Sequence, residues 1–438
     1  MKKVLIISYH FPPMNVIASR RAEAYAMFLR EQEFDITVLT HRWEIDEKEY
    51  KSKDGNPNWK VWDTKASVIY EDNVDYKVIR VPRYKSLRSK LTPFTESVPF
   101  LKKAADLFIW ANGHLDSNID SYYNFRDFLW SHLKNNNYDV VLTIFTPHNH
   151  IKLAYEIKRE FGIPFIADYR DLWDNDLLLK DRRKASTTRG RKIFNYLSLK
   201  FHKKWLKEAL FYSSVSQPIV DKIAELCEVH NGYCIKNGYE SNVFSKLEKQ
   251  YKEEFIILHG GTIYEAQDIS AFIKGLRLFW SNLQDFDKTQ VRVIFLAIKT
   301  KSKERQLIKS LPEIKVEFTQ RLPREQAIQL MKDASILFYP SWTTTSGIYS
   351  GKIFEYLGAG NNILVIPNDH DVVEELINRT GSGLATDSPE EMAEYLKENF
   401  NAWKKDGKSV YKGNKSLIKE YSREFQVEQM AKLIHRHL

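Results

Sequence analysis

A polar loop between residues 339 and 367 holds the residues best suited to chemistry in this sequence. It is rich in Ser, Thr and Gly, and Lys352 and Glu355 follow it at the spacing of neighbours on one helix face. A helix that begins after such a loop offers free N–H groups and a partial positive charge, which suit a diphosphate. Lys352 would add a full charge, and Glu355 could accept hydrogen bonds from a sugar diol. The alternative is a solvated Lys–Glu pair on an ordinary helix.

A second group of charges, Asp168, Arg170 and Asp171, follows the apolar run 163–167. Three charges so close together do not suit a core, so we expect them at the carboxyl end of a strand. A carboxylate there could contact a sugar or orient an acceptor hydroxyl. The alternative is a salt-bridged loop that braces the sheet. His148 and His150 follow another apolar run, but no third ligand lies at a spacing typical of a metal site.

The composition is that of a soluble globular protein of 438 residues, with 43% hydrophobic and 28% charged residues. This length exceeds one compact core, so two domains are expected. The sequence has no apolar window long enough to span a membrane, and its start is too quickly polar for a signal peptide, which favours a cytoplasmic location. The two cysteines make neither a disulfide framework nor a metal site.

Apolar runs alternate with helical patterns along the chain, which predicts α/β domains with doubly wound sheets. Buried strands are expected at 4–8, 36–40, 77–81, 139–145, 163–167, 210–216, 253–258, 291–297, 315–318, 336–339 and 363–366. Helices are expected at 19–32, 151–161, 352–357, 389–403 and 414–438, with Gly358 and Gly360 ending the third of these. Residues 43–75 are expected to form an irregular loop.

Two segments, 84–134 and 180–207, combine basic residues with apolar and aromatic ones and are expected to form amphipathic helices. Together with the net charge of +9, they suit contact with an anionic membrane, at the inner face of the cell membrane, or with a lipid-linked acceptor. The alternatives are helices that cover the core and an ordinary solvated basic surface. A nucleic-acid partner is not expected, because no recognised nucleic-acid module accompanies the charge.

The loop and helix around Lys352 resemble the donor-sugar motif of retaining GT-B glycosyltransferases of the family numbered four. The features that match in order and spacing are Pro340-Ser341, Ser346-Gly347-Ile348 and Glu355-Tyr356-Leu357-Gly358-Ala359-Gly360. The variant at 351–357 is similar to the branch that acts on capsule, O-antigen and related polysaccharides. The resemblance implies the GT-B fold, in which two Rossmann-like doubly wound domains face an interdomain cleft.

The resemblance also implies domain boundaries and an activity. Residues 1–238 would bind the acceptor, residues 250–412 would bind a nucleotide sugar, and a C-terminal helix at 415–438 would cross back onto the first domain. The implied reaction transfers a sugar, with retention, from a nucleotide-diphosphate sugar to a hydroxyl of a glycan or lipid-linked acceptor in cell-surface polysaccharide or glycoconjugate biosynthesis. No cofactor and no metal ion are expected, because this fold class usually needs no divalent ion.

The residues and the resemblance together predict a site in three parts. The expected catalytic residues are Asp168, Asp171 and Lys352. The expected donor-binding residues are Gly260, Gly261, Thr262, Ser346, Gly347, Ile348, Lys352 and Glu355. The expected acceptor-side residues are His10, Asn15, Arg20, His148 and Arg170.

Three positions depart from the family pattern. Gly347 stands where the family usually has a second Glu, residues 264–268 lack its diphosphate-binding Arg and Lys, and residues 12–15 replace two glycines of its first loop. The diphosphate charge is therefore left to Lys352, the loop amides and another base such as Lys299 or Arg321. Two alternatives follow: a catalytically impaired GT-B scaffold or regulatory partner of another transferase, and a nucleotide-sugar epimerase on the same fold.

Overall fold

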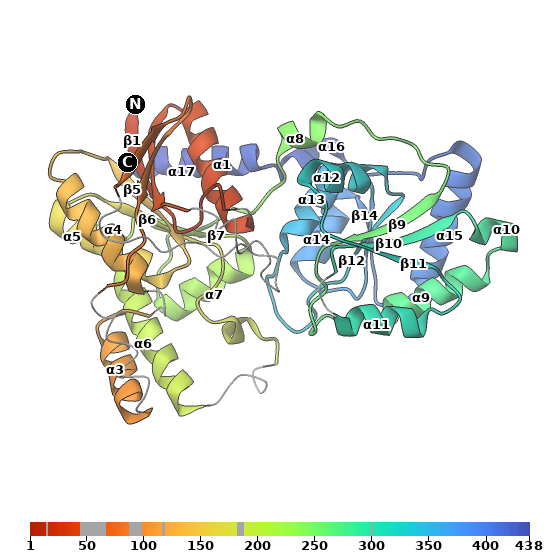
Figure 1. Ribbon diagram of the computed structural model, residues 1–438, viewed down its shortest axis with the longest axis horizontal. Coiled ribbons are helices and arrows are strands. Elements are labelled where there is room, and N and C mark those ends of the chain that lie inside the picture. The colour runs from red at the N-terminus through yellow and green to blue at the C-terminus, as the bar shows by residue number, and fades with distance from the viewer. Residues whose placement is uncertain (15, 44–66, 87–98, 116–118, 182–187, 299–300) are drawn as a thin grey trace. The chain divides into compact units, whose positions relative to one another are not determined.

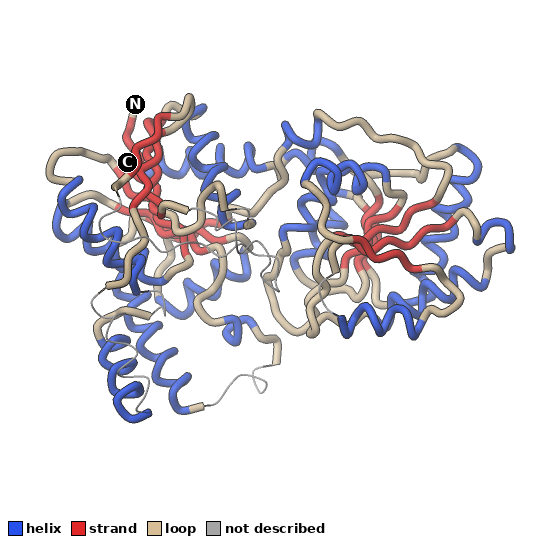
Figure 2. The backbone as a smooth tube through the Cα atoms, viewed as in Figure 1, coloured by secondary structure: helices blue, strands red, loops and turns tan. Residues whose placement is uncertain are grey.

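The computed structural model describes residues 1–14, 16–43, 67–86, 99–115, 119–181, 188–298 and 301–438. The chain forms two compact units (Figure 1). Unit 1 comprises Met1–Leu178, Arg182–Lys236 and Val427–Leu438, and unit 2 comprises Leu179–Asp181 and Asn237–Gln426. Each unit is built around one sheet with helices packed against it (Figure 2).

Within its described residues, unit 1 holds an eight-stranded sheet in the order β3-β4-β2-β1-β5-β6-β7-β8. Its strands are β1 Lys2–Ile7, β2 Phe34–His41, β3 Ile69–Asp72, β4 Lys77–Val81, β5 Val140–Phe145, β6 Phe165–Tyr169, β7 Phe211–Ser214 and β8 Gly232–Cys234. All neighbours pair in parallel except β3, which is antiparallel to β4. The parallel order requires crossover connections, which helices supply.

The helices of unit 1 follow the strands in the alternating order of a doubly wound fold. They are α1 Ile17–Glu31, α3 Pro99–Ala111, α4 Ile119–His132, α5 His148–Phe161, α6 Arg189–Leu206, α7 Gln217–Cys227 and most of α17 Arg423–His437, with a 3-10 turn at Asn175–Leu178. Val427, Met430 and Ile434 of α17 lie in the same apolar cluster as Val4 and Ile36, so the chain ends packed against the sheet with which it begins.

Unit 2 holds a parallel sheet that has six strands in the described residues, in the order β11-β10-β9-β12-β13-β14. Its strands are β9 Phe255–Gly260, β10 Val291–Leu296, β11 Val316–Thr319, β12 Ile336–Tyr339, β13 Asn362–Val365 and β14 Gly383–Ala385. Its helices are α8 Ser241–Ser245, α9 Ser270–Ser281, α10 Asp285–Lys288, α11 Lys301–Ser310, α12 Arg324–Asp333, α13 Gly351–Ala359, α14 Val372–Thr380, α15 Pro389–Asp406 and α16 Lys415–Lys419.

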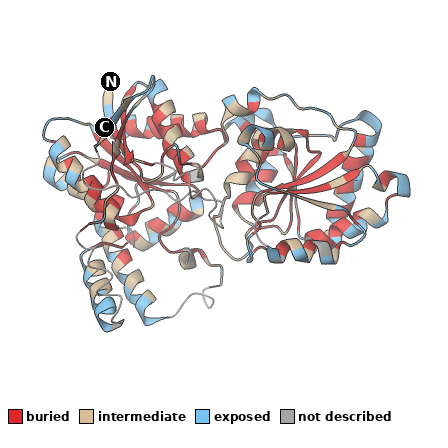
Figure 3. Cartoon of the chain, viewed as in Figure 1, coloured by how far each residue is buried: buried red, intermediate tan, exposed pale blue. Residues whose placement is uncertain are grey.

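The continuous apolar runs of unit 2 form strands that are buried on both faces (Figure 3). Successive residues of β9 point to opposite faces, so Ile257 joins one apolar cluster and Leu258 joins the other. The first cluster includes residues of α9, α11 and α15, and the second includes residues of α12, α13 and α14. The carboxyl ends of β9 and β12, which pair with each other, are therefore held between two packed layers.

The structure corrects several expectations for local elements. The stretch 43–75, expected to be an irregular loop, contains strand β3. Strand β14 was not expected, because its three residues form no apolar pattern. Helix α13 continues through Gly358, because that residue packs inside the unit, where an added Cβ would lie 2.7 Å from Tyr239. Gly360, at φ 70°, is the residue that ends it. The segment 414–438 contains two helices, α16 and α17, where one was expected.

The expected amphipathic segments contain α3, α4 and α6, while residues 87–98 and 182–187 lie outside the described part of the chain. None of the helices in the described part combines the length and the apolar character needed to cross a bilayer.

Candidate functional site

The expected donor loop joins β12 to α13 at the carboxyl edge of the second sheet. Pro340 follows the last residue of β12, and Ser350 occupies the N-cap position of α13. Residues 260–262 leave the neighbouring strand β9 at the same edge. This is where ligands bind in open α/β sheets, because the strands end there and helix N-termini begin.

The structure brings Lys352, in the first turn of α13, against the loop after β9. Its ammonium group donates a hydrogen bond to the carbonyl oxygen of Thr262. Gly261 has φ +86°, and a Cβ at this position would lie 2.8 Å from Cε of Lys352. The close approach of the lysine therefore depends on glycine at position 261. The predicted donor residues Gly261, Thr262 and Lys352 thus lie together.

The ammonium group of Lys352 is partly shielded from solvent. Burial lowers the pKa of Lys352 to about 8, an effect that the nearby carboxylate of Glu355 opposes. Glu355 is half-buried one turn further along α13. A lysine that is poorly solvated and near an open backbone loop gains charge stabilisation when an anion arrives. This arrangement favours a diphosphate partner.

Tyr356 and His259 fix the positions of the strand ends and α13. The hydroxyl of Tyr356 accepts a hydrogen bond from the N–H of Gly260 at 2.8 Å. The His259 ring lies 3.0 Å from the carbonyl oxygen of Phe338 and 3.1 Å from that of Gly261. Burial and then the charge of Lys352 lower the pKa of His259 to about 3, so the neutral ring can donate to only one of these carbonyls.

The Ser346-Gly347-Ile348 loop precedes α13, and Gly347 adopts φ +75°, a conformation that favours glycine. Its N–H donates to a carboxylate oxygen of Asp371 at 2.6 Å. The hydroxyl of Ser341 is buried and has no hydrogen-bond partner among the described residues, and the same holds for Thr345. Unpaired buried hydroxyls are costly unless a ligand or water satisfies them.

A short segment at 179–181, which belongs to unit 2, lies on this loop. Leu179 forms an antiparallel bridge with Thr345, and the N–H of Lys180 donates to the carbonyl oxygen of Thr344 at 3.0 Å. The ammonium group of Lys180 donates to the carbonyl oxygen of Asp369. Sequence reasoning missed this contact, because no local signal links residues so far apart. Of the other expected bases, Arg321 is exposed and Lys299 lies outside the described residues.

In unit 1, several predicted acceptor-side residues lie at the carboxyl edge of β1, β5 and β6, which are neighbours in the sheet. His10 follows β1, His148 follows β5 and Arg170 follows β6. Burial and then the charge of Arg170 lower the pKa of His10 to about 4. Arg20 is half-buried in α1, and Asn15 lies outside the described residues. The roles of these residues in acceptor binding stay predictions.

Asp168 lies inside the core, contrary to the expectation that the three neighbouring charges lie outside it. It is 0% exposed, and Arg21 Nε donates to its Oδ2 at 2.7 Å. Ser213 donates to Oδ1, also at 2.7 Å. The guanidinium and hydroxyl groups replace water around the carboxylate, which makes burial of this charge tolerable. This geometry corresponds to the alternative in which a salt bridge braces the sheet, and catalysis by Asp168 would require the pair to open.

Asp171 is the more accessible carboxylate of the group. Its side chain is 50% exposed, and Arg170 Nε donates to its Oδ2 at 2.7 Å. Sequence reasoning named Arg20 as an acceptor-side residue and did not single out Arg21, which is the partner of Asp168. The available signal was that Arg21 precedes Tyr25 by four residues and so shares the inward face of α1.

His148 is turned into unit 1, where it belongs to a chain of buried polar rings. Its Nδ1 lies 3.0 Å from Nε2 of His202, and Nδ1 of His202 lies 2.6 Å from the hydroxyl of Tyr169. A second chain joins His41 and His150 through Ser121 Oγ, at 2.9 Å and 3.0 Å. Burial lowers the pKa of both His148 and His150 to about 3, so these rings are neutral. In the described residues, no group of three or more His, Cys, Asp or Glu side chains is arranged to hold a metal ion.

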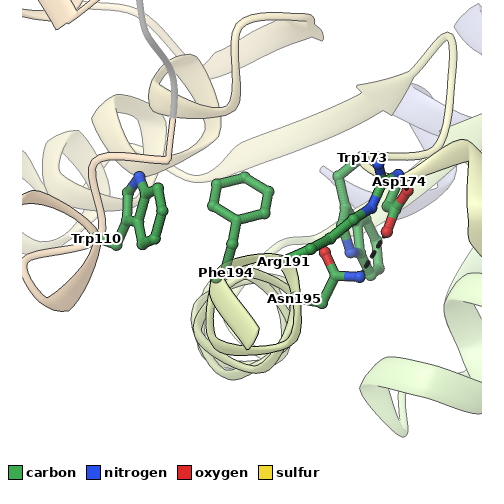
Figure 4. A pocket seen from close by; sticks show the side chains of 7 residues that line it. Trp110, Trp173, Asp174, Arg191, Phe194 and Asn195 are labelled. Atoms are coloured by element: carbon green, nitrogen blue, oxygen red, sulfur yellow. Dashed lines mark hydrogen bonds and ion pairs between the residues drawn. The ribbon is translucent and has the colours of Figure 1, made fainter. Parts of the chain in front are cut away.

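A pocket of about 360 Å³ lies elsewhere in unit 1, between α3, α6 and the segment after β6 (Figure 4). Its lining residues are Trp110, Trp173, Asp174, Gly190, Arg191, Phe194 and Asn195. The carboxylate of Asp174 is buried and bonded to Arg191 and to Asn195 Nδ2. Sequence reasoning had not singled out these residues as a site.

Comparison with known proteins gives likeness in structure only. No protein-family model matches the chain, and no curated protein is significantly similar to it in sequence. Sucrose-phosphate synthase from Thermosynechococcus elongatus is 12% identical with a TM-score of 0.60, over 100% of this chain and 99% of that one. A UDP-forming α,α-trehalose-phosphate synthase from Burkholderia xenovorans, in complex with glucose-6-phosphate, is 10% identical with a TM-score of 0.60, over 99% and 100% of the two chains.

HepE from Anabaena, in complex with UDP and glucose, is 13% identical with a TM-score of 0.57, over 100% of both chains. At these identities the likeness concerns the fold. The chain has the GT-B fold, with two Rossmann-like α/β domains.

Proposed function

We propose that the protein is a glycosyltransferase that uses a nucleotide-diphosphate sugar. The observation that carries this proposal is the position of Lys352. It lies in the first turn of α13, close to the backbone of Gly261 and Thr262. A partly buried cation, a helix N-terminus and a glycine-containing loop would together form a site for a diphosphate. The GT-B fold supports the proposal, since proteins of similar structure include one solved with UDP and glucose and one that is UDP-forming.

In the proposed reaction, the oxygen of an acceptor hydroxyl bonds to the anomeric carbon, the bond from that carbon to the nucleotide diphosphate breaks, and the hydroxyl proton passes to the leaving diphosphate. Negative charge develops on the leaving diphosphate, where Lys352 and the N–H groups of α13 would stabilise it. Glu355 would accept hydrogen bonds from the ribose, and the backbone of residues 346–348 would line the donor. Asp171, which is more accessible than Asp168, would contact the sugar or the acceptor.

The finer parts of the proposal come from the resemblance to retaining GT-B enzymes of family four. They are retention of configuration, a glycan or lipid-linked acceptor, and a role in cell-surface polysaccharide or glycoconjugate biosynthesis. Catalysis without a cofactor or a metal ion, in the cytoplasm, also belongs to the proposal. Domain roles follow the same assignment, with the acceptor in the N-terminal domain and the donor in the C-terminal one.

Calorimetric titration with UDP, and then with a panel of nucleotide sugars, tests the proposal. Lys352→Ala and Glu355→Ala should weaken binding by about tenfold or more, because each removes a charged contact. Lys397→Ala, which changes an exposed lysine of α15, is the matched control and should bind like the wild type. The site assignment is wrong if both site variants keep the wild-type affinity.

Two other outcomes identify the alternatives. A chain that gives no saturable heat with any nucleotide sugar would be a scaffold or a regulatory partner. A chain that converts the donor sugar to its epimer without an acceptor would be an epimerase. Product analysis with and without an added glycan acceptor separates transfer from epimerisation.

A further inference from the structure

Helices α3 and α6 pack against each other and extend from unit 1 away from its sheet (Figure 1). Trp110 of α3 and Phe194 of α6 meet edge to face, with ring centroids 5.2 Å apart, and their rings lie next to each other in Figure 4. Beyond α3, Gly113 lies close against Phe201 of α6. These apolar side chains hold the two helices together, and the side of the pair on which they lie is its inner side.

The outer side of the same pair carries a second set of apolar residues. Phe100 is 77% exposed and Phe108 is 70% exposed, and their spacing of eight residues places them on one face of α3. The other members of this set are Leu101 and Leu107 on α3 and Ile193 and Tyr196 on α6. Single exposed apolar residues are common, but six of them on two helices that pack against each other indicate an interaction surface.

The charges around this set are almost all positive. Helix α6 carries Arg189, Arg191, Lys192, Lys200, Lys203 and Lys204 and has neither Asp nor Glu. Helix α3 adds Lys102 and Lys103 against a single acid, Asp106. Arg191 and Lys203 pair with acidic residues of unit 1, and the ammonium group of Lys204 lies over the ring of Tyr155 in α5. Lys102, Lys103, Lys192 and Lys200 are exposed. The outer side of the pair thus combines basic residues with aromatic ones.

We propose that this outer side of α3 and α6 docks on an anionic phospholipid bilayer. The apolar residues would enter the boundary between headgroups and acyl chains, while the lysines would remain among the phosphates. A bilayer fits better than a protein partner, because the surface is a projecting pair of helices with diffuse positive charge, on which Asp106 is the single acidic residue of α3 and α6. The inference does not rest on the proposed transfer reaction.

Sedimentation of the full-length protein with vesicles tests this inference in the absence of nucleotide. The protein should sediment with vesicles of phosphatidylcholine mixed with phosphatidylglycerol, and less with vesicles of phosphatidylcholine alone. Raising the salt concentration should reduce binding, because it screens the lysines. Phe100→Ser combined with Phe108→Ser should weaken binding by about tenfold or more, because two large apolar groups no longer enter the bilayer.

A matched control is available in unit 2, where Phe286 of α10 is also 70% exposed. Phe286→Ser should bind vesicles like the wild type. Lys192→Glu combined with Lys200→Glu should lower binding to anionic vesicles, whereas Lys397→Glu, at an exposed position of α15, should lower it much less. Circular dichroism confirms that each variant is folded.

Three results would overturn the inference. The first is a wild-type protein that does not sediment with anionic vesicles. The second is a Phe100→Ser, Phe108→Ser variant that binds as well as Phe286→Ser. The third is a wild-type dimer in sedimentation velocity that this double variant makes monomeric without any vesicle binding, since the surface would then join two copies of the chain.

Discussion

Arg21 and Asp168 form a two-point ion pair in the interior of unit 1. Arg21 Nε donates to Oδ2 and Nη2 donates to Oδ1, both at 2.7 Å. The same guanidinium donates to the carbonyl oxygen of Ile235 at 2.9 Å and to that of Lys236 at 3.1 Å. The pair therefore ties α1 to β6 and to the chain that leaves β8.

Asp168→Asn should destabilise unit 1 by about 3–5 kcal/mol, because it leaves the buried Arg21 cation without its counter-charge. Asp171→Asn is the control, and it should cost less than about 1 kcal/mol, because the Asp171 side chain is 50% exposed. Denaturant unfolding of both variants measures the difference. A stable Asp168→Asn variant that has lost transfer activity would instead support the catalytic role predicted from the sequence.

Much of the fold could be predicted from the sequence, because a strand that is buried on both faces has apolar residues at successive positions. Strand β12, whose four residues are all buried, has the predicted bounds for this reason. β3 and β14 lie at the edges of their sheets and are short, so they bury too little to leave such a pattern. The end of α13 was misplaced because a glycine can serve close packing, as Gly358 does, as well as end a helix.

The candidate site was predictable only in part. The approach of Lys352 to Gly261 and Thr262 follows from parallel strands that end at one edge of the sheet. The pairing of Arg21 with Asp168 depends on side-chain contacts between distant segments, which no local spacing encodes. The contact of Leu179 with Thr345 is of the same kind.

The affinity for UDP should fall as the pH rises through about 8. Burial lowers the pKa of Lys352 to about 8, so the free protein loses this cation above that pH, and the diphosphate binds the protonated form. The loss should approach tenfold per pH unit until the pH passes the pKa of Lys352 in the complex. Lys352→Arg should show a nearly flat profile at whatever affinity it has, because its guanidinium stays charged. A flat wild-type profile in calorimetry would contradict the assignment of Lys352.

Gly261→Ala should weaken UDP binding, because its Cβ would lie 2.8 Å from Lys352 Cε and push the lysine away from the loop. The variant should also lose about 1–2 kcal/mol of stability from its left-handed backbone. Gly407→Ala is the control: Gly407 has φ +68° and nothing within 4 Å of an added Cβ, so it carries the strain without the contact. Calorimetry and thermal unfolding compare the two, and equal UDP affinities would show that Lys352 does not need glycine at 261.

Acidification should destabilise unit 1 more than unit 2. In unit 1, burial lowers the pKa of His148 and His150 to about 3. Burial also lowers the pKa values of His41 and His202 of this unit well below the usual range. Among the described residues of unit 2, the buried histidine is His259. Below about pH 6.5, each of these histidines is protonated in the unfolded chain but stays neutral in the folded one. Each ring therefore lowers the free energy of unfolding by up to about 1.4 kcal/mol for every pH unit of acidification.

The stability that these histidines give is thus complete above about pH 6.5 and is lost as the pH falls toward their folded-state pKa values. Amide hydrogen exchange, corrected for intrinsic rates and followed from about pH 7.5 to about pH 5.5, resolves the two units separately. Peptides from β1, β5 and β6 should lose more protection than peptides from β9, β10 and β12. An equal loss in both sheets would mean that the two chains of rings, His148–His202–Tyr169 and His41–Ser121–His150, take up protons without opening unit 1.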